Sequence, residues 1–359
     1  MRSVYIIAEA GVNHNGSREM AFQLVDAAVK AGADAVKFQT FKAESLVTKS
    51  AQKANYQKQS TAGDESQFSM LKRLELPYDL HHELVNYCQE NSIDFLSTAF
   101  DSESLDFLVK DIGLKRLKIP SGEIINGPML LEHALTGCDL ILSTGMATLG
   151  EIEDALAILA FGFLNVDSTQ IDPSRVAFQE AFLSEEGSRL LKERVTLLHC
   201  TTEYPAPINE INLNAMLTMR NLFNLKVGYS DHSEGISVST AATALGAVLI
   251  EKHFTLDKSL PGPDHIASLE PDELKSMVDA IRTIEMALGS GTKEPTPSEL
   301  KNQYIVRKSL VACREIREGE EFNENNIAVK RPGTGISPMR YWDLLGEKAS
   351  TSLVSDQLL

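Results

Sequence analysis

Eight short apolar runs, separated by longer segments with helical periodicity, constrain the fold of this chain more than any other feature. The runs are apolar almost throughout, as expected of strands that are covered on both faces. They span residues 4–9, 35–39, 94–100, 116–119, 139–144, 195–200, 226–230 and 247–253. Eight strands that alternate with helices predict an α/β fold, the TIM (β/α)8 barrel.

Helix boundary signals support this alternation. Between the first two runs, Ser17 is placed to cap a helix and Gly32 to end it. Residues 271–288 show a second helical pattern with acidic residues near its start. An open doubly wound sheet is the alternative fold, but residues 11–16 lack the GxGxxG spacing of its phosphate-binding turn. The barrel is therefore the preferred prediction.

The pattern changes after the last of these helices, which indicates a second domain. Residues 289–303 are rich in Ser, Gly, Thr and Pro and predict a linker. Residues 304–359 contain short apolar runs between glycine- and proline-rich turns, and predict a small, mostly β domain. The predicted organisation is a catalytic barrel over residues 1–288, the linker, and this C-terminal domain.

The segment 157–193, between the fifth and sixth runs, is unusually long for a barrel connection. Its pattern predicts the end of one helix near residue 163 and a second helix over 176–191. Because it leads into the N-terminal end of a strand, we expect it to stabilise the fold and not to carry chemistry.

Charge and cysteine usage limit the partners and the compartment. The chain has 34 Lys and Arg against 50 Asp and Glu, a net charge of −16, which argues against a nucleic-acid or membrane-surface partner. No apolar run reaches the roughly 18 residues that a membrane span needs. The segment before the first run is too short for a secretory signal, and the four cysteines are scattered. We therefore expect a cytoplasmic location.

Polar or ionisable residues lie near or just beyond the carboxyl end of every one of the eight runs. In a barrel the carboxyl ends of the strands form the active site. A purely structural barrel has no need for such groups at all eight ends, because each must be desolvated or paired. They include Glu9, Lys37, Gln39, Thr98, Lys118, Ser121, Glu123, Ser143, Thr202, Tyr204, Ser230, His232, Glu251 and His253.

Two lysines within this set indicate an anion site. Lys37 and Lys118 lie inside apolar runs, where an unpaired lysine is seldom buried. For either one alone, a salt-bridged core lysine is an equally good explanation. Two of them on different strands, with Ser143 and Ser230 nearby, favour a site for phosphate or carboxylate.

Two histidines indicate a metal. His232 and His253 end neighbouring strands. A lone histidine at a strand end is more often a satisfied polar residue than a ligand. A pair, with Glu9, Glu251 and Asp264 available, favours a divalent ion such as Mn²⁺, Fe²⁺, Co²⁺ or Zn²⁺, whereas Mg²⁺ prefers oxygen ligands. The chain has no HExxH motif and no cysteine cluster, which argues against a structural zinc site.

Motifs along nearly the whole chain resemble the sialic acid synthase family and occur in the family's order. They lie at residues 7–16, 36–40, 118–123, 142–146, 199–205, 228–232, 250–254, 261–265 and 330–333. The resemblance implies that the enzyme condenses phosphoenolpyruvate with N-acetylmannosamine and water to N-acetylneuraminate and phosphate by C–O cleavage. The alternative is the very similar legionaminic acid synthase reaction with 2,4-diacetamido-2,4,6-trideoxymannose.

The resemblance also implies an architecture and a cofactor. A TIM barrel would be followed by an antifreeze-like (SAF) domain, in a domain-swapped homodimer in which each SAF domain closes the partner's barrel. A divalent metal would be required, with Mn²⁺ favoured and Mg²⁺ or Co²⁺ as alternatives. None of these points follows from composition or periodicity alone.

Individual roles are carried over from the family to the matching positions. The resemblance implies catalytic roles for Glu9, Lys37, Lys118, His232 and His253, of which the two histidines bind the metal. It implies phosphoenolpyruvate binding by Lys37, Thr98, Lys118, Ser121, Ser143 and Ser230. It implies sugar binding by Gln39, Glu123, Thr202, Tyr204, Asp264 and, from the SAF domain, Arg331. Thr202 stands where some members have asparagine, and Ala99 where many have proline.

Two other functions compete with this prediction. A phosphoenolpyruvate aldol enzyme that acts on a phosphorylated sugar should carry extra arginines at the strand ends, and the eight runs end without any. A non-catalytic carbohydrate- or ice-binding protein would not need Lys37, Lys118, His232 and His253 together at the mouth of a barrel.

Overall fold

Eight parallel strands close into a barrel in the order of the sequence. The computed structural model describes residues 3–49, 51–53 and 65–359, so Met1 and Arg2, with which the predicted barrel domain begins, lie outside the described residues. The strands are β1 (Tyr5–Gly11), β2 (Ala35–Thr40), β3 (Asp94–Ala99), β4 (Arg116–Ile119), β5 (Asp139–Ser143), β6 (Val195–His199), β7 (Lys226–Asp231) and β8 (Leu249–His253). The barrel prediction is confirmed, and the strand limits differ from the predicted runs by at most two residues.

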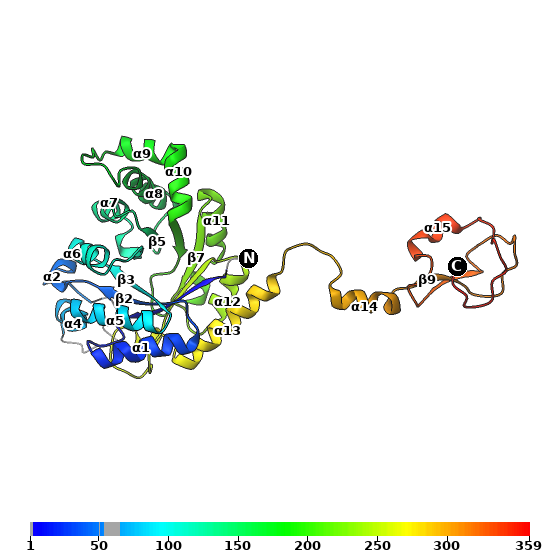
Figure 1. The fold of residues 1–359 in the computed structure, drawn as a ribbon, viewed down its shortest axis with the longest axis horizontal. Coiled ribbons are helices and arrows are strands. Elements are labelled where there is room, and N and C mark those ends of the chain that lie inside the picture. The colour runs from blue at the N-terminus through cyan, green and yellow to red at the C-terminus, as the bar shows by residue number, and fades with distance from the viewer. Residues whose placement is uncertain (1–2, 50, 54–64) are drawn as a thin grey trace. The chain divides into compact units, whose positions relative to one another are not determined.

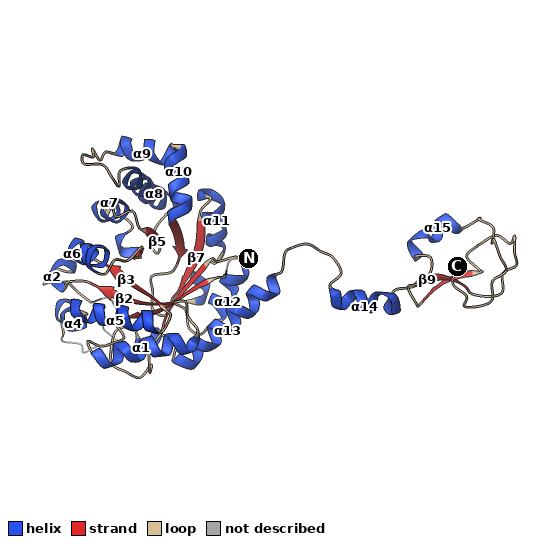
Figure 2. Ribbon diagram, in the orientation of Figure 1, coloured by secondary structure: helices blue, strands red, loops and turns tan. Residues whose placement is uncertain are grey.

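Helices surround these strands, as Figures 1 and 2 show. They are α1 (Arg18–Ala31), α2 (Ala43–Leu46), α4 (Gln67–Leu74), α5 (Tyr78–Glu90), α6 (Ser102–Asp106), α7 (Gly127–Leu135), α8 (Leu149–Leu164), α9 (Arg175–Leu183), α10 (Glu185–Arg194), α11 (Asn214–Phe223), α12 (Ser237–Ala244) and α13 (Pro271–Leu288). Short 3₁₀ turns span Ser121–Glu123, Ile208–Glu210 and His265–Ala267, and a π-helical turn spans Phe107–Asp111.

The helix boundaries that the sequence predicted at Ser17 and Gly32 are present in the structure. The Ser17 hydroxyl accepts a hydrogen bond from the Met20 amide at the start of α1. Gly32 ends that helix in the left-handed conformation, with φ of 83°. The second predicted helix is α13, whose bounds match the prediction.

Side chains inside the barrel form layers that follow the two-residue period of a strand. One apolar layer consists of Ile7, Ala35, Leu96, Ile141, Leu198 and Leu249. Two residues further along their strands come Glu9, Lys37, Thr98, Ser143 and Glu251, all buried. Because alternate side chains of a strand share a face, these polar groups lie above the apolar layer, toward the carboxyl ends.

The long connection between β5 and β6 differs from the prediction in one respect. The helix predicted to end near residue 163 is α8, but the single helix predicted over 176–191 is two helices, α9 and α10. Ser184 separates them in an extended conformation, and its hydroxyl accepts a hydrogen bond from the Gly187 amide at 3.0 Å. A Cβ atom at Gly187 would lie 2.0 Å from the Ala181 carbonyl oxygen, so this tight break requires glycine.

The chain divides into two compact units, Met1–Leu288 and Gly289–Leu359. In the second unit, β9 (Ser309–Ala312) pairs antiparallel with β10 (Ile327–Lys330). Its core consists of Ala312, Ile316, Phe322, Ile327, Ala349 and Leu353. A 3₁₀ turn (Pro338–Arg340) and the short helix α15 (Tyr341–Leu344) follow the strands.

Part of the segment predicted as a linker, residues 289–303, is helical. Helix α14 spans Pro297–Val306. Thr296 and Glu299 form a capping box at its start, and Pro297 occupies the first turn, where a missing amide hydrogen has no cost. These local signals stabilise a helix despite the proline-rich composition before it.

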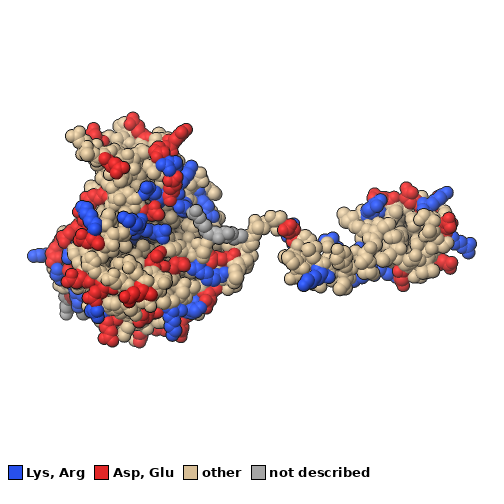
Figure 3. Space-filling view, viewed as in Figure 1, with Lys and Arg blue, Asp and Glu red and all other residues tan. Residues whose placement is uncertain are grey.

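Acidic and basic side chains are intermixed on the face shown in Figure 3. None of the described helices is both long and apolar enough to cross a membrane.

Candidate functional site

A cavity of about 320 Å³ opens at the carboxyl ends of the barrel strands and is lined by most of the residues that the sequence singled out. Those residues are Glu9, Lys37, Gln39, Thr98, Lys118, Ser121, Ser143, Thr202, Tyr204, Ser230, His232, Glu251, His253 and Asp264. The strands position them because each one ends beside its neighbours at the same end of the barrel. The structure thus brings most of the predicted set together, while the role of each residue stays a prediction.

Two lysines and two glutamates form a buried cluster at the bottom of this cavity. The Nζ atom of Lys37 lies 2.7 Å from Glu9 Oε2 and 3.6 Å from Glu251 Oε2. The Nζ atom of Lys118 lies 3.0 Å from Glu251 Oε1. Lys37 also donates to the Thr98 hydroxyl at 3.0 Å. The two lysines are therefore coupled through one shared carboxylate.

The sequence indicated Glu251 only as a strand-end acid available to a metal, and the structure gives it a more central position. Its Oε1 atom accepts a hydrogen bond from the Ser230 hydroxyl at 2.9 Å in addition to the Lys118 contact. The signal in the sequence is an acidic residue within an apolar strand, two positions before His253. The partners on β2, β4 and β7 become visible only once the barrel closes.

The two glutamates of the cluster have different proton affinities. Burial acts to raise the pKa of Glu251, but Lys118 and Lys37 outweigh it and hold that pKa well below its usual range. Burial raises the pKa of Glu9. Lys37 acts to lower this pKa, but Lys37 is shared with Glu251, whose negative charge also raises it. Burial would lower the pKa of Lys37, but Glu251 and Glu9 raise it. Glu9 is therefore the carboxyl group of the pair that can retain a proton.

The hydrogen bonds of His232 fix its tautomer. Its Nδ1 atom lies 2.6 Å from the Thr201 carbonyl oxygen. Since a carbonyl only accepts, Nδ1 carries the proton and Nε2 has the lone pair. The Nε2 atom lies 3.2 Å from the Tyr204 hydroxyl and 3.3 Å from the Ser230 hydroxyl, both of which line the cavity.

His253 lies beside it, with 5.7 Å between the two ring centroids. Its buried Nδ1 atom has no hydrogen-bond partner among the described residues. The carboxylate of Asp264 is 3.8 Å away from that atom. Burial lowers the pKa of His232 to about 4 and holds the pKa of His253 well below its ordinary value. Both imidazoles are thus neutral at physiological pH, as metal ligands must be.

The donor set fits a divalent metal with open coordination positions. Within the described part of the chain, no group of three or more His, Cys, Asp or Glu side chains is arranged to hold an ion. His232 and His253 would therefore supply two nitrogen ligands and leave the other positions to substrate and water. In addition, Lys37 and Lys118 are largely offset by Glu9 and Glu251, so an anionic substrate would benefit from the added positive charge.

Two predicted residues lie outside the described set of strand-end side chains that line the cavity within the barrel unit, Glu123 on a neighbouring turn and Arg331 in the second unit. Glu123 lies in the 3₁₀ turn after β4, where its carboxylate accepts a hydrogen bond from the Asn126 side chain at 2.6 Å. Arg331 lies in the second unit, where its Nε atom donates to the Val306 carbonyl at 3.0 Å. Asn126 is the N-cap residue of α7, and the amide nitrogen of the same side chain holds the Glu123 carboxylate beside the start of that helix.

One wall of the cavity is apolar, and the sequence did not indicate it. Its side chains are Val12, Leu46, Met70, Leu71, Leu74 and Phe100. Three of these belong to α4, a helix in the connection between β2 and β3. Nothing in the hydrophobic pattern distinguishes them from ordinary core residues, so only the fold reveals that they face the cavity.

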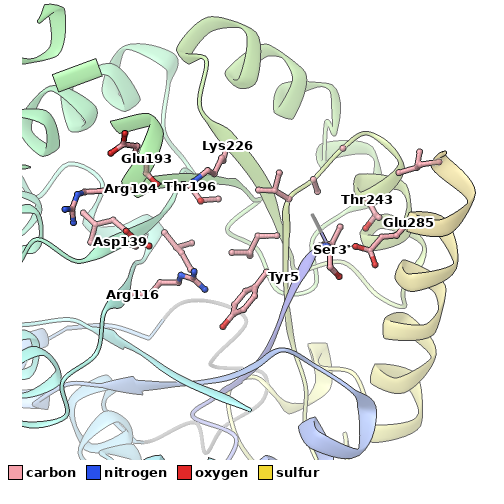
Figure 4. A pocket seen from close by; sticks show the side chains of 18 residues that line it. Ser3, Tyr5, Arg116, Asp139, Glu193, Arg194, Thr196, Lys226, Thr243 and Glu285 are labelled. Carbon is pink, nitrogen blue, oxygen red and sulfur yellow. Dashed lines mark hydrogen bonds between the residues drawn. The ribbon is translucent and has the colours of Figure 1, made fainter. Parts of the chain in front are cut away.

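Another cavity, of about 530 Å³, lies at the opposite, N-terminal ends of the strands (Figure 4). There the Arg116 guanidinium lies 4.7 Å from the centre of the Tyr5 ring. Glu285 is paired with Arg282 at 3.1 Å. The described residues that line this second cavity include no histidine, and the lysine–glutamate cluster is at the other end of the barrel. We therefore place the chemistry at the carboxyl ends, as in other TIM barrels.

The sequence matches the NeuB family over residues 24–293 and the SAF domain over residues 307–359. It is 50% identical over 359 residues to N,N'-diacetyllegionaminic acid synthase of Campylobacter jejuni. The aligned region covers 100% of this chain and 99% of the relative. The enzyme of the same name from Legionella pneumophila is 45% identical over 349 residues, 97% of this chain and 91% of the relative.

A crystal structure of N-acetylneuraminic acid (sialic acid) synthetase from Leptospira borgpetersenii, in complex with citrate, has a similar fold. The two chains are 33% identical with a TM-score of 0.67, and the match covers 84% of this chain and 90% of the other. The SAF match confirms the predicted type of the C-terminal domain.

Proposed function

This chain belongs to the NeuB family, and from that membership we propose that it condenses phosphoenolpyruvate with 2,4-diacetamido-2,4,6-trideoxymannose and water to N,N'-diacetyllegionaminic acid and phosphate. The coarser assignment, a phosphoenolpyruvate-dependent nonulosonic acid synthase, follows from the family. The observation that carries the choice of sugar is the 50% identity, over the whole chain, to a relative with that activity in its name. From the sequence alone, N-acetylneuraminate synthesis is the main prediction and legionaminic acid synthesis is the alternative. We adopt the alternative.

The apolar wall of the cavity supports this choice. The trideoxy sugar ends in a methyl group at C6, where N-acetylmannosamine has a hydroxymethyl group with a free hydroxyl. A methyl group gains free energy when it leaves water, whereas a hydroxyl group buried without a partner costs about 1–3 kcal/mol. Contacts with Met70, Leu71 and Phe100 would favour the methyl group. The described lining residues also include no arginine that could bind a second phosphate.

Lys37 and Lys118 are proposed to bind the phosphate and carboxylate of phosphoenolpyruvate. Each ammonium group has three N–H donors, so it can hold substrate while it keeps a glutamate contact. Hydroxyl groups around them add neutral donors; these are the side chains of Thr98, Ser121, Ser143 and Ser230. Ser121 is itself held in place, because the Gly145 amide donates to its Oγ atom at 3.1 Å.

The reaction requires C3 of phosphoenolpyruvate to attack the aldehyde carbon of the sugar. A divalent ion held by His232 and His253 would supply Lewis-acid polarisation of that aldehyde. The lysines hold the reacting carbons at close range and reduce the entropic part of the barrier. Attack leaves a cationic centre at C2, to which water adds, and the C–O bond to phosphate then breaks. Glu9, the carboxyl group that retains a proton, is placed to exchange a proton in these steps.

The sugar would be held by the remaining polar residues of the cavity, Gln39, Thr202, Tyr204 and Asp264. Burial raises the pKa of Asp264 to about 6, so its carboxyl group can donate or accept a hydrogen bond near neutral pH. For Glu123 and Arg331 the sugar-binding role depends on the family resemblance alone. The same is true of the domain-swapped homodimer.

Phosphate release with each of the two sugars tests the proposed substrate. We expect kcat/KM for the trideoxy sugar to exceed that for N-acetylmannosamine by about tenfold or more, which corresponds to about 1.4 kcal/mol. Phosphoenolpyruvate without sugar serves as the control for uncoupled hydrolysis. Equal or better use of N-acetylmannosamine would reject the trideoxy sugar and favour N-acetylneuraminate synthesis.

A further inference from the structure

A fully buried ion pair lies directly behind the two histidines, and no step of the proposed mechanism uses it. The Nζ atom of Lys252 lies 3.2 Å from Asp231 Oδ2, and both side chains have 0% exposure. Asp231 is the last residue of β7, and Lys252 is its register partner on β8. The pair therefore joins the two strands whose ends carry His232 and His253.

Hydrogen bonds extend this pair into a network. Asp231 Oδ1 accepts from the Ser233 amide at 2.9 Å and from the Ser233 hydroxyl at 2.6 Å. Asp231 Oδ2 accepts from the Ser239 hydroxyl of α12 at 2.6 Å. Lys252 donates to the Ser233 carbonyl. The network links β7, β8, the loop after β7 and a surrounding helix.

The network restrains the backbone at both histidines. His232 lies between Asp231 and Ser233, and both of these residues are held by it. On β8, Lys252 immediately precedes His253, and since strand side chains alternate, the two point to opposite faces of the barrel wall. The position of one imidazole relative to the other thus depends on a contact on the far side of that wall.

A role in stability alone does not account for two buried charges at this place. An apolar pair of similar volume is commonly as stable as a buried ion pair, or more stable. Outer-shell contacts that orient metal ligands, in contrast, change metal affinity strongly when they are removed.

We infer that Asp231 and Lys252 are positioning residues that hold His232 and His253 at the separation needed to bind the divalent ion. The inference depends on the proposed function in one respect, namely that these histidines are the metal ligands. It concerns this chain's own residues and can be tested without turnover.

The test is a Mn²⁺ titration of metal-free protein, followed by electron paramagnetic resonance of free Mn²⁺. The variant is Asp231→Asn with Lys252→Met, which removes both charges together and leaves no unpaired ion. We expect its Kd for Mn²⁺ to rise by about 10–100-fold. The matched control is Asp34→Asn with Arg282→Met, which removes a 2.7 Å ion pair far from the histidines. The control should lose stability in urea but keep the parent Kd to within about twofold.

Each outcome has a distinct meaning. A folded Asp231→Asn, Lys252→Met variant with the parent Kd would overturn the positioning role and leave the proposed function intact. A parent protein that binds no Mn²⁺ would overturn the metal assignment and the positioning role together. If the double variant does not fold, Ser239→Ala removes one donor to Asp231 and keeps the ion pair. A folded Ser239→Ala protein should show a Kd raised by about 2–5-fold, and an unchanged Kd would contradict the inference.

Discussion

Replacement of His253 by alanine is expected to lower kcat/KM by about 10³-fold or more, because it removes one of the two nitrogen ligands, His232 and His253, that we propose for the metal. Exhaustive chelation of the parent protein should cause a comparable loss. Added Mn²⁺ should restore the chelated parent and should not restore the variant at the same concentration. Steady-state phosphate release measures all three.

His133→Ala is the matched control for this prediction. His133 is likewise buried, and burial lowers its pKa to about 4. It lies in α7, where Nδ1 donates to the Met129 carbonyl, away from the cavity. The control should therefore lose stability and retain turnover. Full turnover by a chelated parent that contains no metal by elemental analysis would contradict the metal's role.

Lys37→Met is expected to lower kcat/KM by about 10³-fold and also to destabilise the fold by about 3–5 kcal/mol. The catalytic loss follows from the loss of a phosphoenolpyruvate-binding cation. The loss of stability follows because Glu9 is left buried without the ion pair at 2.7 Å. Urea unfolding and steady-state kinetics measure the two effects separately.

A second variant separates folding from catalysis at this cluster. Lys37→Met with Glu9→Gln removes both charges of the pair, and Glu251 keeps its contact with Lys118 at 3.0 Å. We expect most of the stability to return while turnover stays at least about 10³-fold reduced. Recovery of turnover to within about tenfold of the parent would show that neither residue is needed for the chemistry.

Much of the barrel could be predicted from the sequence because its strands are buried on both faces and stand out as apolar runs. The polar layer was also readable, since Lys37 and Glu9 interrupt otherwise apolar strands. The break at Ser184 was missed because both sides of it carry the same helical pattern, and only the close approach of Gly187 to Ala181 shows the tight turn.

Features that depend on contacts between distant segments could not be predicted in this way. Glu251 becomes the centre of the cluster because Lys37 and Lys118 come from other strands of the closed barrel. The apolar wall comes from α4, whose residues look like ordinary core positions in the sequence. The ion pair of Asp231 and Lys252 depends on the register of β7 and β8, which apolar runs do not specify.

The most direct test of the proposed reaction uses phosphoenolpyruvate labelled with heavy oxygen at the bridging position, together with the trideoxy sugar. Mass spectrometry of both products then shows which bond breaks. C–O cleavage at this site predicts that the label appears in inorganic phosphate and that one sugar acid forms for each phosphate released. Label retained in the sugar acid, or phosphate released without any sugar acid, would contradict it.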